Sequence, residues 1–155
     1  MDYKKCAEET MHYIMNHPSK PRRKESDTFY KGEMKILGYL FFHKEEATPG
    51  ELGEFMGVSS ARVARALKSL EEKKIIQRTT LLQDRRKTVV SLTDIGKETF
   101  QKKHDESVEY MSRLFSKLGE HDTLECIRII EKILRISSEI GNDNLKKKDI
   151  DKKKG

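Results

Sequence analysis

Apolar residues recur every three or four positions along most of this chain, which is the period of a helix with one buried face. This pattern predicts helices at 3–16, 31–45, 60–73, 94–118 and 121–140. A shorter helix is expected between Thr48 and Gly57. Thr48, Pro49 and Glu51 together form a start signal, and Gly57 suits the end of a helix. The chain is therefore predicted to be mainly helical.

Two runs rich in β-forming residues interrupt the helical pattern after residue 73. They are "IIQRTTLL" at 75–82 and "KTVVSL" at 87–92, and residues 83–86 join them, which predicts a β-hairpin. Thr93 can cap the helix that follows, and Gly119 ends it. Helix, tight turn, helix and hairpin is the order of a winged helix-turn-helix. We expect a mainly α fold with a small β-hairpin wing, completed by N- and C-terminal dimerisation helices.

The positive charge of the chain is concentrated in two places. Charged residues make up 37% of the sequence and hydrophobic residues 35%, with a net charge of +6 at pH 7. Residues 57–90 hold nine lysines and arginines against three acids, and residues 142–155 hold six lysines against three aspartates. Clustered positive charge is typical of proteins that bind polyanions. A solvated charged surface is the alternative, and it is favoured for 142–155.

The helix predicted at 60–73 has a buried stripe and a cationic face. The stripe consists of Val63, Ala66, Leu67 and Leu70. Arg62 and Arg65 lie on the opposite face, where guanidinium groups can reach phosphates or guanine acceptors in a major groove. Ser59 or Ser60 can cap this helix, and the unpaired N–H groups beside them can bind a phosphate. This face therefore suits DNA.

The predicted hairpin supplies a second cationic surface. Arg85, Arg86 and Lys87 stand together at its tip, which is narrow enough to enter a minor groove. Asp84 can fix the guanidinium of Arg86 by a hydrogen bond. The residues expected to contact DNA are Ser59, Ser60, Arg62, Arg65, Lys68, Arg85, Arg86 and Lys87, and Asp84 is expected to support the wing.

The length of 155 residues supports a single domain. We expect it to span 1–141, with a DNA-binding part at about 30–92 and dimerisation helices at 1–17 and 94–141. Residues 142–155 lack a hydrophobic face and are expected to form a disordered Lys-rich tail. Little chain is left to cover one face of the last helix, so we expect a second subunit to cover it. The residues of this dimerisation face are Leu124, Ile127, Ile130, Leu134 and Ile140.

In these segments the chain resembles the MarR (multiple antibiotic resistance) family of bacterial transcription regulators. The resemblance rests on "GVSSARVARALKSLEEKKIIQR" and on "QDRRKTVVSLTDIGKE", and with the flanking helices it covers roughly 30–140. The second stretch matches the wing pattern of the family at Asp84, Arg86, Leu92, Thr93 and Gly96. The resemblance implies an obligate dimer with interlocked terminal helices, whose recognition helices enter successive major grooves. It also implies DNA contacts from Ser60, Arg62, Arg65 and Arg86, with Asp84 in support.

Other kinds of site find little support in the sequence. A Gly-rich phosphate loop, a nucleophile elbow and paired carboxylates are all missing, so we expect neither an enzyme nor a cofactor. His104, Asp105 and Glu106 suggest a metal sensor only faintly, and we expect no metal site. Two cysteines and the lack of a long apolar run favour a cytoplasmic protein. Cys6 is either a redox-sensing thiol or, as we favour, an inert one.

We therefore expect a homodimeric, sequence-specific regulator that binds double-stranded DNA at a pseudo-palindromic operator. The expected mode is repression, tuned by a small-molecule effector or by redox state. The alternative is a winged helix that uses its arginines to bind an acidic protein partner.

Overall fold

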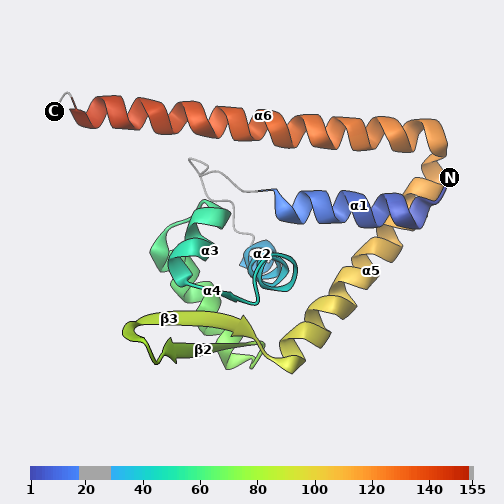
Figure 1. Ribbon diagram of the computed structural model, residues 1–155. Helices are drawn as coiled ribbons and strands as arrows, with labels where there is room; N and C mark the ends of the chain where they lie inside the picture. The colour runs from blue at the N-terminus through green and yellow to red at the C-terminus, as the bar shows by residue number, and fades with distance from the viewer. Residues whose placement is uncertain (18–28, 154–155) are drawn as a thin grey trace.

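A small winged unit lies beside a layer of long helices in the computed structural model, which describes residues 1–17 and 29–153 (Figure 1). The helices are α1 (Tyr3–Asn16), α2 (Phe29–Phe42), α3 (Pro49–Met56), α4 (Ser60–Glu72), α5 (Asp94–Leu118) and α6 (Glu120–Lys153). The strands are β1 (Glu46–Ala47), β2 (Ile76–Leu81) and β3 (Asp84–Leu92). The predicted fold, mainly α with a β-hairpin wing, is confirmed.

Several helix ends lie where the local sequence predicts them. Thr48 and Glu51 form a complete capping box at the start of α3, and Gly57 ends that helix in the left-handed conformation with φ of 64°. Ser59 caps α4 and Thr93 caps α5 through side-chain acceptors. Gly119 separates α5 from α6, with φ of 82°. These short-range signals need no tertiary partner, which is why the sequence reveals them.

The sheet has one strand more than the sequence predicts. Its order is β1-β3-β2 with antiparallel pairing, and the added strand pairs Glu46 with Ser91 and Ala47 with Val90. A two-residue strand is defined only by its partner, because it is too short to carry an alternating pattern of its own. Strand β3 of this sheet packs against α2 and α3.

The main core lies where α2 crosses the other elements. Buried side chains meet there from α2, α3, α4, the sheet and α5, and they include Ile36, Leu37, Leu40, Leu52, Val63, Leu67, Leu70, Val90 and Phe100. Gly38 of α2 faces Met15 of α1, and an added Cβ would lie 2.5 Å from Cε of Met15, so that side chain would have to move. Burial of this many aliphatic and aromatic side chains is the main stabilising contribution to the fold.

A second core holds the terminal helices together. Ala7, Val108 and Phe115 are buried at its centre, and Cys6 and Cys126 pack against it. Thr123 donates its hydroxyl proton to the carbonyl of Phe115, so the start of α6 is tied to the end of α5. Figure 1 shows α5 leading from the sheet to this layer, where α6 runs alongside α1 and beyond it.

The last helix is longer than the sequence predicts. We expected it to end near Ile140, followed by a disordered tail at 142–155, but α6 continues to Lys153. Gly141 does not interrupt it, since a single glycine costs only about 1 kcal/mol in a helix. The segment that follows contains no proline, and its lysines and Leu145 are good helix formers. The lack of a hydrophobic face was therefore a poor guide to secondary structure here.

Candidate nucleic-acid interface

Helix α4 is held in place by one face and leaves the other open. Its buried residues are the predicted stripe of Val63, Ala66, Leu67 and Leu70. The left-handed Gly57 allows a tight turn between α3 and α4, and the hydroxyl oxygen of Ser59 accepts a hydrogen bond from the N–H of Arg62 at 3.4 Å. The packed stripe fixes the rotation of the helix, so the direction of its open face is also fixed.

The open face of α4 is cationic. Ser59, Ser60, Arg65 and Lys68 are exposed, whereas Arg62 is half-buried and already engaged with other groups of the chain. The first turn of α4 contains no acidic residue, so nothing there cancels the positive end of the helix dipole. Lys68 lies 4.0 Å from Glu72, an exposed pair that holds Lys68 only weakly. Arg65 and Lys68 are therefore the cations most available to a ligand.

The wing differs in detail from the predicted hairpin. The sequence predicted a connection at 83–86, but the turn lies at Leu82 and Gln83, and β3 already begins at Asp84. Thr80 pairs with Thr88 and Leu81 with Asp84, so residues 85–87 form a bulge between these two pairs. The side chains of Arg85, Arg86 and Lys87 are exposed on this bulge. A period-two pattern cannot reveal a bulge, because the bulge interrupts that period.

Asp84 also acts differently from the prediction. Its carboxylate accepts a hydrogen bond from the backbone N–H of Arg86 at 3.0 Å. The predicted partner was the guanidinium of Arg86. The observed bond closes a local Asx-type turn, so Asp84 supports the backbone of the wing and leaves the arginine side chain exposed.

Ion pairs and a hydroxyl fix the base of the wing relative to α4. The ammonium of Lys73 lies 3.0 Å from the carboxylate of Glu33, which is buried on α2. The guanidinium of Arg78 lies 3.2 Å from the carboxylate of Glu71 and joins β2 to the end of α4. Thr93 donates its hydroxyl proton to the carbonyl of Lys74 at 2.6 Å.

Gly96 completes the base of the wing. A Cβ at this position would lie 2.0 Å from the carbonyl oxygen of Ile75, so only glycine lets α5 start so close to the sheet. Together with the ion pairs, this contact fixes the position of the wing relative to α4.

Leu82 is a surface feature that the sequence does not reveal. Its side chain is 100% exposed at the tip of the wing. The sequence placed it at the end of a strand, as the last residue of "IIQRTTLL", where a leucine is unremarkable. In the turn its side chain is fully open to solvent, so the tip of a cationic hairpin also carries an apolar side chain.

The predicted dimerisation face of α6 is only partly open to solvent in one chain. Ile127 and Ile130 line a crevice with Cys6, Thr10 and Tyr13 of α1 in the same chain, so they are partly covered without a second subunit. Leu134 is half-buried, while Leu124 and Ile140 are exposed. A different row on α6 is open to solvent and consists of Ile129, Ile133, Ile136 and Ile140. The cover comes from α1, which is far away in sequence, and the assignment of this face to dimerisation stays a prediction.

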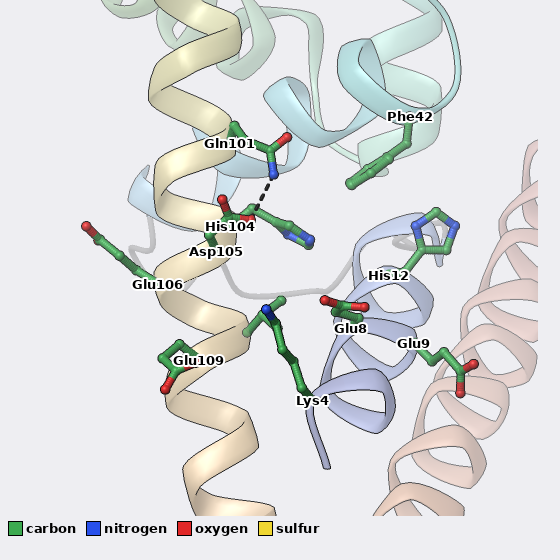
Figure 2. A pocket seen from close by; sticks show the side chains of 11 residues that line it. Lys4, Glu8, Glu9, His12, Phe42, Gln101, His104, Asp105, Glu106 and Glu109 are labelled. Carbon is green, nitrogen blue, oxygen red and sulfur yellow. Dashed lines mark hydrogen bonds between the residues drawn. The ribbon is translucent and has the colours of Figure 1, made fainter. Parts of the chain in front are cut away.

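A cleft of about 800 Å³ lies between α1 and α5 (Figure 2). Five of its eleven lining residues are acidic, namely Glu8, Glu9, Asp105, Glu106 and Glu109, and Lys4 supplies the one ammonium among the lining residues. Three rings also line the cleft and lie close together, because the ring centre of Phe42 is 4.9 Å from that of His12 and 5.5 Å from that of His104. In Figure 2 the imidazole of His104 points from α5 towards Glu8 and His12 of α1.

His104 is the most unusual group in this cleft. Its Nδ1 atom is buried and has no hydrogen-bond partner among the described residues. Burial lowers the pKa of His104 below its ordinary value, against the nearby charges of Asp105 and Glu8, which act in the opposite direction. The imidazole is therefore held in its neutral form at pH 7.

Other candidate sites have little support in the described chain. Cys6 and Cys126 are free and partly buried. Within residues 1–17 and 29–153, no group of three or more histidine, cysteine or acidic side chains is placed to hold a metal ion. In the same ranges, none of the helices is both long enough and apolar enough to span a membrane.

The sequence of this chain is similar to known regulators. Residues 33–88 match the sequence profile of the MarR family. The uncharacterised HTH-type transcriptional regulator YdgJ of Bacillus subtilis (strain 168) is 28% identical over 103 residues. The matched part covers 66% of this chain and 61% of YdgJ, so the chain spans about three fifths of that relative.

Solved structures resemble the fold as well. YusO from Bacillus subtilis is 30% identical with a TM-score of 0.56, and the match covers 67% of this chain and 73% of YusO. MepR of S. aureus, solved as a complex with DNA, is 26% identical with a TM-score of 0.55. That match covers 66% of this chain and 75% of MepR.

Proposed function

This chain belongs to the MarR family, and we propose that it acts as a dimeric regulator that binds specific sites on double-stranded DNA. The observation that carries the proposal is the open face of α4. A helix with a fixed rotation, a first turn free of acids and exposed Arg65 and Lys68 has the form and charge of a major-groove reader. MepR, a relative of similar fold, has been solved with DNA, which supports the same use of the fold here.

In this proposal Arg65 faces base edges and the wing enters an adjacent minor groove. Arg85, Arg86 and Lys87 are exposed on the bulge and would contact phosphates and the narrow groove of A·T-rich sequence. Leu82 would meet the groove as an apolar wedge at the tip. Ser59 and Ser60 would contact a phosphate at the start of α4. Arg62 is half-buried, so it would help to position α4 rather than contact bases.

The dimer would form through the terminal helices. Ile129, Ile133, Ile136 and Ile140 recur at spacings of four, three and four along α6, which is the pattern of a helix that packs on another helix. A contiguous exposed row of isoleucines is costly in water, so a second copy is the simplest cover. Two-fold symmetry would then place two α4 helices on a pseudo-palindromic site, where a bound dimer would repress transcription by blocking the polymerase.

The cleft between α1 and α5 is proposed as the effector site. Its excess of carboxylates over cations and its cluster of aromatic rings suit a planar aromatic cation better than an anion. Benzamidine and benzoate have similar shape and opposite charge, so they form a matched pair of probes. Benzamidine should shift the NMR signals of the His104 imidazole and benzoate should not. Equal shifts with both would show that charge does not select the ligand.

The proposed DNA contacts are tested by titrating variants against a duplex that the wild-type protein selects from random sequence. Arg65→Ala should lose discrimination of about 1–3 kcal/mol at one position of each half-site. Arg86→Ala should keep those preferences but lose the penalty for replacing flanking A·T pairs by G·C.

Lys117→Ala is the matched control for that titration, because Lys117 is an exposed cation on α5 outside both surfaces. It should bind as the wild type does. If Arg65→Ala and Arg86→Ala both bind like this control, the assignment of α4 and the wing to DNA is wrong. Binding to an acidic protein, together with no preference among duplexes, would favour the interaction-module alternative.

A further inference from the structure

The end of α1 is connected by hydrogen bonds to two other helices, and Lys35 of one of them also contacts a third. The Nε2 atom of His17 lies 2.6 Å from the hydroxyl of Ser138 on α6. The carbonyl oxygen of His17 accepts a hydrogen bond from the ammonium of Lys35 on α2 at 2.9 Å. The same ammonium lies 5.2 Å from the ring centre of Phe55 on α3. We name the set His17, Lys35, Phe55 and Ser138 the His17 junction.

Lys35 occupies its place in the junction at a cost. Burial lowers its pKa from the ordinary value of 10.5 to about 8. The ammonium is therefore less stable here than in water, while an unbranched apolar side chain such as methionine would fill the same space without that cost. The free energy of folding thus does not explain why a lysine stands at this position. A role in orienting neighbouring groups does explain it, because a charge-assisted hydrogen bond and a cation–π contact both have direction.

The junction joins the two parts of the molecule. His17 and Ser138 belong to the layer of terminal helices, and Lys35 and Phe55 belong to the winged unit that carries α4. Packing also joins the two parts, where Met15 of α1 meets Gly38 of α2 and where α5 contributes Phe100 to the main core. Apolar packing brings two surfaces together but is not directional, so it leaves some freedom of rotation. The hydrogen bonds of the junction add a directional restraint to this packing.

We infer that the His17 junction sets the angle between the winged unit and the terminal helices, and through it the spacing of half-sites that the protein accepts. This inference rests on the proposed function for its DNA consequence. In a dimer the terminal helices hold the two subunits together. Any rotation of the winged unit relative to them therefore moves α4 relative to α4 of the second subunit. Lys35 and His17 are thus positioning residues, which act on DNA only through the placement of α4.

The DNA test compares spacings of the selected duplex. One base pair is inserted or removed between the half-sites, which shifts them by about 3.4 Å and about 34°. The wild type should lose at least about tenfold in affinity for either change. Lys35→Met and Ser138→Ala should lose less than about threefold in affinity when the spacing is changed. A variant with both substitutions should show the same loss as either single variant. Lys44→Met is the control, because Lys44 forms an exposed ion pair with Glu51 and touches no part of the junction.

A second measurement needs no DNA. Spin labels at residues 65 and 132, both exposed, report the distance between α4 and α6 within one chain, in a Cys6→Ala, Cys126→Ala background diluted with unlabelled protein. The distance distribution should be narrow in the parent and in Lys44→Met, and broader in Lys35→Met and Ser138→Ala. Unchanged widths in the two junction variants overturn the inference, whatever the DNA result. Broader widths in a protein that prefers no duplex would support the junction and refute only the proposed function.

Discussion

The charge state of Lys35 affects the stability of this fold. Its pKa is about 8 in the folded chain and near 10.5 when unfolded. Between these values the unfolded state binds more protons, so the free energy of unfolding should rise with pH through that window. Below pH 8 both states are charged, and the folded state carries the full cost of burying the ammonium.

Lys35→Met should therefore be more stable than the wild type at pH 7, and the difference should shrink as pH rises towards 10.5. Urea unfolding of both proteins at pH 7, 8, 9 and 10 measures this difference, and other titrating groups cancel in the subtraction. A variant that is less stable than the wild type at pH 7 would show that the ammonium is stabilised in place. Higher stability together with weaker spacing selectivity is a result that a merely structural role for Lys35 would not give.

Asp84 offers a sharp test at the tip of the wing. Its carboxylate accepts from the N–H of Arg86, and an asparagine amide oxygen can replace that acceptor without the charge. Asp84→Asn should thus bind the selected duplex as tightly as the wild type or tighter, because a negative charge near phosphate is removed. Asp84→Ala should bind more weakly, by about 0.5–1.5 kcal/mol, since the turn loses its hydrogen bond. Equal affinities for the two variants would mean that only the charge of Asp84 matters.

At the scale of elements, α6 carries the apolar row that the proposed dimer needs. Ile133 lies in the middle of this row and is 55% exposed in one chain. Ile133→Asp would bury a charge at the interface, so the protein should sediment as a monomer of 18.1 kDa at micromolar concentration. Lys132→Asp changes a neighbouring exposed residue and should leave the mass at about twice that value. A dimer that survives Ile133→Asp would place the interface elsewhere.

Elements defined by short-range signals could be predicted from the sequence. The capping box at Thr48, the left-handed Gly57 and the cap at Thr93 each act within a few residues, and all three are in place. The buried stripe of α4 also follows from the helical period.

Features that depend on distant partners could not be predicted. Strand β1 exists only through its pairing with Ser91 and Val90, and the bulge at 85–87 depends on register between strands. The cover that α1 gives to Ile127 and Ile130 joins opposite ends of the chain. The candidate site shows the same division, because the cationic residues were visible in the sequence while the partner of Asp84 and the exposure of Leu82 were not.

For the whole molecule, charge and geometry together determine how the protein should bind DNA. Exposed cations on α4 and on the wing should meet the phosphates of two half-sites at once, while Arg65 reads bases within each half-site. Phosphate contacts release counterions, so affinity must fall steeply with salt. Base contacts must add a preference for one sequence on top of that. A protein that uses the same face for an acidic partner would still bind DNA weakly and with a salt dependence, but it would prefer no sequence.

The most direct test is the affinity of the wild-type protein for its selected pseudo-palindrome and for a scrambled duplex of the same composition, at 50 and 200 mM salt. Specific binding should be at least about 10³-fold tighter than binding to the scrambled duplex at the higher salt. Affinity for both duplexes should fall between the two salt concentrations, by about 10³-fold or more for the selected one if six or more phosphates are contacted. Equal affinity for the two duplexes, or an affinity that does not change with salt, would contradict the proposed function as a sequence-specific DNA-binding protein.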